Sequence, residues 1–344
     1  VIDLVHPSPS ADRPWQGDLF RHALDRRHGR GEVPEVLRTL TNNMLIRRAA
    51  VQQPDVLLNA DALREAGMTW EDALSLAGPK VDKQRLWEAL IQSMGIFALA
   101  RNLRNFDQSG VSDAVAAQVC ARFADPEQVA KSRMFPFRWL AAYRHAPSLR
   151  WSYALEKALT ASLANVPALS GRTLLMVDVS GSMTSPMSGK SELNCRDAAA
   201  VFASALALRA QDPTLVWFNH TNGGVDVPKG GSLLRLTDAI PKPDGGTYTA
   251  AAVNRWYAGH DRVIVVTDEQ AVTDEQAAAG YYGDPSQQVP AHVPFYTWNL
   301  AGYQRGHGPS GSANRHTFGG LTDQAFALIP LIEAGRRCAW PWQS

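Results

Sequence analysis

Hydrophobic positions follow two different periods along the chain, and the change falls near residue 171. Residues 1–165 place apolar side chains three and four positions apart, the spacing of amphipathic helices. The segments that carry this pattern are residues 31–48, 68–78, 82–106, 110–124 and 152–166. The first half is therefore predicted to be a succession of α-helices, with almost no strand signal.

Helix-boundary residues support this prediction. Pro34 is expected in the first turn of the helix within 31–48, since proline is tolerated there. Thr69 and Ser112 are expected to cap the starts of two further helices, and Gly78 to end the first of these. Short breakers separate the helices, so stacked helical pairs of the HEAT-repeat kind are the simplest packing, although no consensus recurs at a fixed period.

From Gly171 onward, short apolar runs alternate with helical stretches. The runs are typical of buried parallel strands, and they lie at residues 172–180, 214–219, 262–268 and 292–298. The helical stretches between and after them lie at residues 195–210, 249–259 and 322–335. This alternation predicts a doubly wound, Rossmann-like α/β sheet. With a linker at 165–171, the predicted domains are a helical domain, 1–165, and an α/β domain, 171–344.

Oxygen-bearing side chains gather where three predicted elements meet. Asp178, Ser180 and Ser182 follow the first apolar run, Thr247 lies in a Gly-Gly-Thr sequence that opens a helix, and Asp268 ends another run. Ligands of such sheets bind at the carboxyl ends of the strands, so these five residues are expected to lie together. An oxygen-only donor set favours Mg²⁺, with Mn²⁺ or Ca²⁺ as alternatives. Neutral hydroxyl ligands would leave the cation positive enough to bind an anion.

Two catalytic interpretations of this loop fit less well. An aspartyl nucleophile of the phosphatase type usually has a second acid two positions on, where this chain has Ser180. A serine hydrolase would present Gly-x-Ser-x-Gly, and the first of these glycines is absent here. A fold that kept the loops but binds no metal is a further alternative.

Composition and charge narrow the class of protein. Of 344 residues, 45% are hydrophobic and 19% charged, as in folded globular proteins. No apolar run approaches the ~20 residues needed to cross a bilayer, and no signal-peptide pattern opens the chain. The three cysteines, Cys120, Cys195 and Cys338, are far apart, which argues against disulfides and a zinc site and favours the cytoplasm. Residues 1–170 hold 21 Lys and Arg against 18 Asp and Glu, a weak excess of +3.

The sequences DVSGS, GGT and TD, in this order, resemble the metal-ion-dependent adhesion site of von Willebrand factor A domains. Segments from both halves also resemble the Ro autoantigen (TROVE-domain) family of RNA-binding proteins. They are DLVHPSPS (3–10), LWEALIQSMGIFALARNLRNF (86–106), AKSRMFPFRWLAAYRHA (130–146), GRTLLMVDVSGSM (171–183), PDGGTYTAAAVNRW (243–256) and RVIVVTDEQ (262–270).

The resemblance implies a ring of helical repeats closed by an A domain. It implies binding of small structured non-coding RNAs (Y RNAs) on the outer face, passage of single-stranded ends of misfolded RNA through the hole, and RNA quality control alongside an exoribonuclease. The family's helical domain is longer than the 165 residues seen here. We therefore expect that the early helices are missing, either because the chain is a fragment or because another chain supplies them.

Residues are carried over where the motifs match. His6 corresponds to a family position implicated in Y RNA binding. Arg101 and Arg104, at helical spacing with Asn105, could share a face and contact phosphates, or they could belong to a solvated helix face.

Lys131, Arg133 and Arg138 are interleaved with Phe135, Phe137 and Trp139. Basic residues with aromatic rings suit single-stranded RNA, although such rings are more often part of a core.

These observations leave a favoured function and two others. The favoured one is a non-catalytic, Ro-type RNA-binding protein with a Mg²⁺ site in its A domain. The alternative is a metal-dependent protein-interaction module whose A domain captures an acidic residue of a partner. A Mg²⁺-dependent hydrolase is the least favoured.

Overall fold

The computed structural model describes residues 8–79, 81–146, 148–187, 193–268, 284–301, 314–320 and 325–336. The chain divides into two compact units, Val1–Val119 and Cys120–Ser344. The first unit is helical. The second contains a six-stranded sheet, the helices that cover it, and the helices that precede it in the chain from residue 120 onward.

The first unit confirms the predicted run of helices. Thr69 caps α5, because its side chain accepts a hydrogen bond from the Asp72 amide, and Gly78 ends this helix with a positive φ of 53°. Pro34 was predicted within the first turn of its helix, but it lies outside, since α3 begins at Arg38. The described helices of this unit are α2 (Trp15–Arg27), α3 (Arg38–Gln52), η1 (Pro54–Leu58), α4 (Ala60–Glu65), α5 (Trp70–Ala77), α6 (Lys83–Ile91), α7 (Ile96–Arg101), α8 (Leu103–Gln108) and the start of α9 (Asp113–Ala124).

Residues 82–106 form three helices rather than one continuous pattern. The α6 helix ends at Ile91, and α7 and α8 meet at Asn102. Asn102 is buried, and its side-chain amide donates to the Ala98 carbonyl over 2.8 Å. A side chain that bonds back to its own helix in this way competes with continued helical pairing.

The helices α10 (Pro126–Ser132), α11 (Pro136–His145) and α12 (Ser152–Ala161) belong to the same compact unit as the sheet. The α11 helix packs on α13 (Cys195–Arg209), and Arg144 of α11 forms an ion pair with Asp197 of α13. The period changes near residue 171 because the first strand, β1, begins at Leu169. The compact units nevertheless divide between residues 119 and 120, because these contacts join the last helices to the α/β part.

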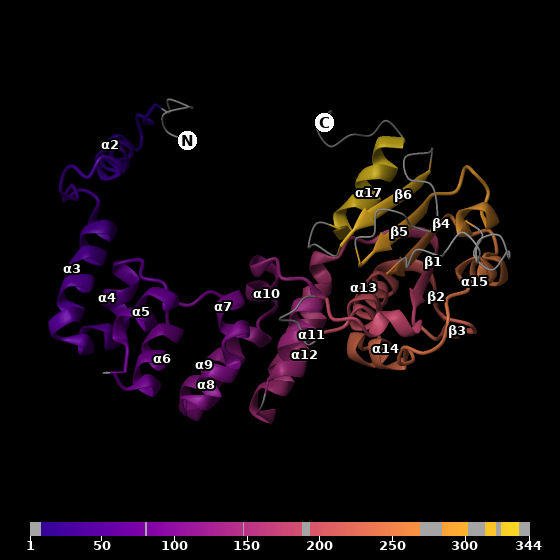
Figure 1. Ribbon diagram of the computed structural model, residues 1–344, viewed down its shortest axis with the longest axis horizontal. Coiled ribbons are helices and arrows are strands. Elements are labelled where there is room, and N and C mark those ends of the chain that lie inside the picture. Colours follow the sequence, from indigo (N-terminus) through magenta and orange to yellow (C-terminus); the bar gives the residue numbers. More distant parts are fainter. Residues whose placement is uncertain are drawn as a thin grey trace. The chain divides into compact units, whose positions relative to one another are not determined.

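The sheet has the strand order β3-β2-β1-β4-β5-β6 (Figure 1). The central strands β1, β2, β4 and β5 were predicted and pair in parallel. Two edge strands were not predicted: β3, which is antiparallel to β2, and β6, which is parallel to β5. The strands are β1 (Leu169–Asp178), β2 (Ala210–Phe218), β3 (Asn222–Val225), β4 (Arg262–Thr267), β5 (Phe295–Asn299) and β6 (Arg315–Gly319).

Helices cover both faces of this sheet, with α13 and α15 (Thr249–Trp256) on opposite sides in Figure 1. On the α15 side, Leu174 and Met176 of β1 join a buried apolar cluster with Val253 of the helix. On the α13 side, Phe202 contacts Trp298 of β5 and Phe326 of α17 (Ala325–Arg336). A short helix, α14 (Leu233–Ala239), packs on α13. Burial on both faces explains the continuous apolar strands.

At the amino-terminal end of β4, a buried ion pair holds α17 to the sheet. The Arg262 guanidinium donates to both carboxylate oxygens of Glu333, over 2.6 and 2.9 Å. It also donates to the Thr173 hydroxyl of β1 over 2.8 Å and to the Ser170 carbonyl. Four oxygens thus accept hydrogen bonds from this arginine, and the Glu333 carboxylate neutralises its charge.

The β3 strand pairs with only the second half of β2. Its described partners are Leu215–Phe218, so Ala210–Thr214 have no strand partner on that side among the described residues. The Phe218 carbonyl accepts from the Val179 amide on the β1 side. Because backbone groups of successive residues point to alternate sides, position 213 faces the open side. That residue is Pro213, which has no amide hydrogen.

Candidate metal centre and RNA-contact residues

Asp178 ends β1 and is fully buried. Its Oδ1 accepts a hydrogen bond from the Ser180 amide over 2.8 Å, and its Oδ2 accepts from the Thr267 hydroxyl over 2.6 Å. These two bonds fix the carboxylate between its own loop and the end of β4. The sequence reasoning missed Thr267, although its place directly before Asp268 offered the signal.

Burial dominates the electrostatics of Asp178 and raises its pKa to about 6. The hydrogen bonds from Thr267 and Ser180 act in the opposite direction, while the negative charge of Asp268 raises the pKa further. Asp268 is 3% exposed and directly follows β4, the parallel neighbour of β1. The fold thus brings two buried acids close enough to repel each other.

The two predicted serines also lie together. The hydroxyl oxygens of Ser180 and Ser182 are 3.1 Å apart, and Ser180 is 1% exposed. The chain turns here into a short 3₁₀ helix, η4 (Gly181–Thr184). Asp178, Ser180 and Ser182 therefore present their oxygens on one tight loop, as the sequence predicted.

The segment 244–248 is bonded to this loop through its backbone. The Asp244 amide donates to the Val179 carbonyl over 2.8 Å, and the Gly181 amide donates to the Gly245 carbonyl over 2.9 Å. Thr247 follows two residues later, half-buried, just before α15 begins. All three predicted loops thus converge on the carboxyl edge of the sheet.

A further buried hydroxyl at this edge belongs to Thr249. It is 4% exposed, and its Oγ1 has no hydrogen-bond partner among the residues that the structure describes. Sequence reasoning did not select it, although Thr-Tyr-Thr contains a second hydroxyl two residues after Thr247. A buried hydroxyl without a partner is costly, so a polar group that binds nearby would relieve it.

All five predicted donors are oxygen atoms. Within the described ranges, no group of three or more His, Cys, Asp or Glu side chains is placed to hold a metal ion. The five predicted donors include only two acids, so a cation there would rely on hydroxyl oxygens as well. Such a donor set suits Mg²⁺, Mn²⁺ or Ca²⁺ rather than zinc or copper.

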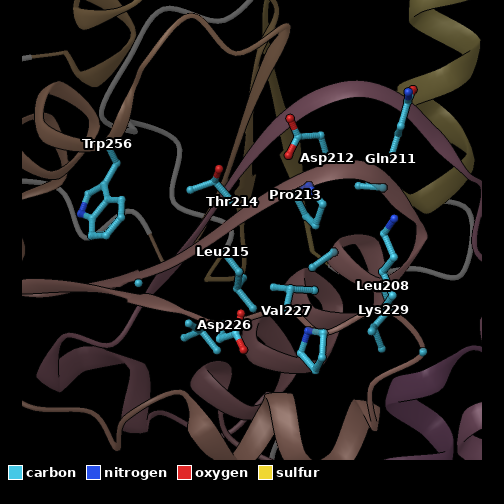
Figure 2. Close-up of a pocket in the computed structure, with 16 residues that line it drawn as sticks. Leu208, Gln211, Asp212, Pro213, Thr214, Leu215, Asp226, Val227, Lys229 and Trp256 are labelled. Carbon is cyan, nitrogen blue, oxygen red and sulfur yellow. The ribbon is translucent and has the colours of Figure 1, made fainter.

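A hollow on the α/β part lies away from these donors, beside the amino-terminal half of β2 (Figure 2). It encloses about 710 Å³ and is lined by β2, the end of β3, the following segment to Gly230, and Trp256. Its polar side chains include Asp212, Asp226 and Lys229, and none of the five predicted donors lines it. The hollow and the predicted metal centre are therefore separate places on the α/β part.

The predicted RNA-contact residues of the first unit are exposed. Arg101 ends α7 and lies 5.5 Å from the ring centroid of Phe97, while Arg104 is in α8. The continuous helix that would give them a common face is interrupted at Asn102. Asn105 donates to the Asn102 side chain over 2.8 Å and is half-buried, so its polar group serves the helix junction.

In the second unit, Lys131, Arg133 and Arg138 are also exposed. Lys131 forms a surface ion pair with Glu127 over 3.4 Å, and Arg133 ends α10 with a left-handed φ of 54°. Arg138 lies over the ring of Phe137, 5.3 Å from its centroid.

Two of the aromatic residues interleaved with these cations pack against other rings, and one of them, Trp139, belongs to the core. Phe135 stacks on Phe326 with ring centroids 5.0 Å apart, and Trp139 is fully buried against Phe123. Because Trp139 is fully buried, its interpretation as a base-stacking residue is wrong, and the core alternative holds for it. Phe135 is half-buried with one ring partner, so its contact with a base stays a prediction.

His6 lies outside the described residues, so its predicted contact with RNA stays a prediction. None of the helices that the structure describes has the length and apolar character needed to span a membrane.

Two family models match the chain. Residues 64–150 match the TROVE domain, and residues 172–280 match the Ro60 vWA domain. The second match contains all five predicted donors. Together the two models cover both the helical part and the α/β part.

Individual relatives agree with the models. The RNA-binding protein RO60 of Caenorhabditis elegans is 32% identical over 153 residues, 40% of this chain and 23% of the relative. RNA-binding protein RO60 of Deinococcus radiodurans is 34% identical over 148 residues, 38% of this chain and 28% of the relative. Telomerase protein component 1 of Mus musculus is 39% identical over 77 residues, 22% of this chain and 3% of the relative. The matches thus span less than a third of the length of each of these relatives.

A solved structure shares the fold. The crystal structure of the Deinococcus radiodurans RO (RSR) protein superposes with a TM-score of 0.70, at 20% identity, over 98% of this chain and 70% of that one. The chain therefore contains a TROVE domain and a Ro60 vWA domain, it is similar in sequence to proteins named RNA-binding protein RO60, and it shares the fold of the Deinococcus radiodurans protein.

Proposed function

We propose that this chain binds RNA and does not itself catalyse a reaction. The observation that carries the proposal is the TROVE domain at residues 64–150 together with relatives that are named RNA-binding proteins. Four exposed arginines lie within this match and would supply charge for phosphate contacts: Arg101, Arg104, Arg133 and Arg138.

The ligand class that we propose is a small structured non-coding RNA of the Y type, with single-stranded ends of misfolded RNA as a second ligand. Family resemblance supports a role in RNA quality control, in which an exoribonuclease partner supplies the nuclease activity. Exposed arginines on short helices are suited to phosphates of folded RNA, because they do not require unpaired bases.

We propose further that the carboxyl edge of the sheet binds Mg²⁺ through Asp178, Ser180, Ser182, Thr247 and Asp268. Two observations support the fit: two buried acids lie close enough to repel each other, and the buried Thr249 hydroxyl is without a partner in the described part of the chain. A bound Mg²⁺ supplies positive charge at an open coordination position, which a phosphate or carboxylate can occupy. Asp178, Ser180 and Asp268, which are buried, would hold the ion together with Ser182 and Thr247.

A second candidate function is a metal-dependent protein-interaction module that captures an acidic residue of a partner. The specific observation in its favour is that the oxygen cluster lies at the edge of the A domain and uses none of the predicted RNA-contact residues.

Salt dependence tests RNA binding. If about five phosphates are contacted, raising salt from about 50 to about 200 mM should weaken binding of a small structured RNA by roughly two to three orders of magnitude. Filter binding measures this change. An affinity that is indifferent to salt would contradict the proposal.

Matched arginine variants test the location. Arg101→Gln with Arg104→Gln should lower both the affinity and the salt slope, whereas Arg64→Gln should do neither. Arg64 is an exposed arginine of the same unit, already paired with Asp61. Equal losses in both variants would show that the effect is general charge rather than a contact.

Asp178→Ala separates the two candidate functions. If the edge captures a protein partner, this variant loses the partner in a pull-down while it retains RNA. If the variant loses the RNA, the metal site belongs to the RNA interface, and the separation proposed here is wrong.

A further inference from the structure

Asn219 lies at the carboxyl end of β2, beside the metal centre proposed above. It is 6% exposed, and the family-pattern residues do not include it. Its side-chain amide donates to the Asp244 carbonyl over 2.9 Å, and its backbone carbonyl accepts from the Tyr248 amide over 3.0 Å. The residue directly after β2 therefore holds the segment 244–248 at both ends, with Thr247 between them.

The same segment is fixed from its other side by the loop that carries the serines. The Asp244 amide donates to the Val179 carbonyl, and the Gly245 carbonyl accepts from the Gly181 amide. The bonds from β2 and from the β1 loop thus act on residues 244, 245 and 248. Thr247 is presented by a short segment whose backbone is held from two directions.

The turn that contains Asn219 is itself fixed. The Asn219 Oδ1 accepts from the Thr221 amide over 2.7 Å and from the Thr221 hydroxyl over 3.0 Å. Its amide oxygen and amide nitrogen therefore have different partners, which orients the group unambiguously. An aspartate in its place would keep the acceptor for Thr221 but lose the donor for Asp244.

Gly245 shows how closely the turn and the segment approach. It has a φ of +68°, and a Cβ added there would lie 1.9 Å from Nδ1 of His220, the residue after Asn219. Only glycine fits both the backbone conformation and this space. The contact between turn and segment is therefore built into the fold on both sides.

We propose that Asn219 is a positioning residue of the metal centre, which acts by fixing Thr247 as a ligand. This proposal rests on the metal site proposed above. Residues that orient metal ligands typically change affinity by about 10- to 100-fold when they are replaced. Asn219→Ala is therefore expected to weaken Mn²⁺ binding by that factor, although Asn219 does not itself contact the ion.

Asn222→Ala is the matched control. Asn222 begins β3 in the same hairpin, and its side chain accepts one hydrogen bond, from Trp256 Nε1 over 2.9 Å. It has no bond to residues 244–248 in the described structure. Mn²⁺ titrations of the full chain, followed by electron paramagnetic resonance, should show less than about a threefold change in this variant.

A double-mutant cycle gives a measurement that a merely structural role would not change. If Asn219 acts through Thr247, Asn219→Ala should have little further effect on Mn²⁺ affinity once Thr247→Ala is present. Thermal unfolding of the same variants checks that they fold. Should Asn219→Ala fail to fold, Asn219→Asp provides the test, because it keeps the acceptor for Thr221 and removes the donor to Asp244. Its added negative charge attracts a cation, so a loss of Mn²⁺ affinity in this variant would support the positioning role, and a gain or no change would contradict it.

Three results would overturn the proposal. Additive losses in the cycle would show that Asn219 acts independently of Thr247. Losses of equal size in Asn219→Ala and Asn222→Ala would show a general effect of the hairpin. If the unaltered chain does not bind Mn²⁺, the metal site itself is refuted; if it binds and Asn219→Ala binds equally well, only the positioning role is refuted.

Discussion

The two ends of the parallel sheet treat buried charge in opposite ways. At the amino-terminal end, Arg262 is 4% exposed and is neutralised by Glu333 through two hydrogen bonds. At the carboxyl end, Asp178 is fully buried, and the charge that acts on it is that of a second acid, Asp268. A buried charge is retained cheaply only when it is compensated. The comparison separates a charge that serves stability from one that is suited to a ligand.

The largest expected effect comes from the amino-terminal end. Arg262→Met leaves the Glu333 carboxylate, which is 15% exposed, without its partner, so the free energy of unfolding should fall by about 3 kcal/mol. Urea unfolding measures the change. Lys131→Met, which breaks an exposed ion pair with Glu127, should cost less than about 1 kcal/mol. Equal effects of the two variants would contradict the distinction between buried and exposed pairs.

Asp178→Asn tests the carboxyl end. Asparagine can still accept from the Ser180 amide and can donate to the Thr267 hydroxyl, so the fold should be kept. Mg²⁺ at about 100 times its Kd should stabilise the unaltered chain by ~2.7 kcal/mol and the variant by nothing. Thermal unfolding with and without Mg²⁺ measures this. Equal stabilisation of both proteins would remove Asp178 from the site.

Removing the hydroxyl of either of two buried threonines should change the free energy of unfolding by a smaller amount, and by different amounts at the two ends of the sheet. Thr173 accepts from Arg262, so Thr173→Val should cost about 1–3 kcal/mol of stability. The Thr249 hydroxyl has no partner within the described ranges, so Thr249→Val should change stability in the absence of metal by less than about 1 kcal/mol. Chemical unfolding compares the two. A larger loss in Thr249→Val would show that its hydroxyl is already satisfied.

The smallest expected effect is a dependence on pH from His260, near the amino-terminal end. It is 3% exposed, its Nδ1 accepts from the Ala258 amide, and its Nε2 lies 3.0 Å from the Thr214 hydroxyl. Burial, and then the positive charge of Arg172, lower its pKa below the ordinary value of 6.5. The unfolded chain therefore binds the proton first, and stability should fall as the pH drops below 6.5 toward the lowered pKa.

The measurement belongs in the Asp178→Asn background, because Asp178 produces the opposite slope. Its raised pKa of about 6 makes the folded chain bind the proton first, so its contribution to stability falls as the pH rises from about 4 to 6. In that background, His260→Gln should flatten the loss of stability below pH 6.5. An unchanged slope would show that another group is responsible.

The sequence predicted those elements whose physics is local or is repeated along the chain. The buried strands β1 and β4 are continuous apolar runs, and the helix with Thr69 and Gly78 carries its own boundaries. The edge strand β3 was missed because Asn-Gly-Gly-Val has little strand propensity and packs its glycines against Trp217 and Trp256. The helices within residues 82–106 were predicted, but the break at Asn102 was not, because an asparagine inside a helical pattern ends the helix only when its side chain bonds back to the preceding turn.

In the candidate site too, the features set by local sequence could be predicted, and those set by distant contacts could not. Its three loops could be predicted because strand ends of a parallel sheet meet at one edge. The residues that hold the loops could not. Asn219 reaches Asp244, 25 positions away, and Thr267 reaches Asp178, 89 positions away. Asparagine and threonine at such positions look like ordinary loop and strand-end residues until the fold brings their partners to them.

Pro213 has a consequence for how copies of this protein behave at high concentration. The unpartnered half of β2 would otherwise be a template on which a strand from another molecule could grow. An incoming strand would meet a pyrrolidine ring at the point where it needs a donor, and the ladder would stop there. We therefore expect Pro213 to limit strand pairing between copies of this protein, together with the charged residues Asp212 and Lys229 that line the same margin.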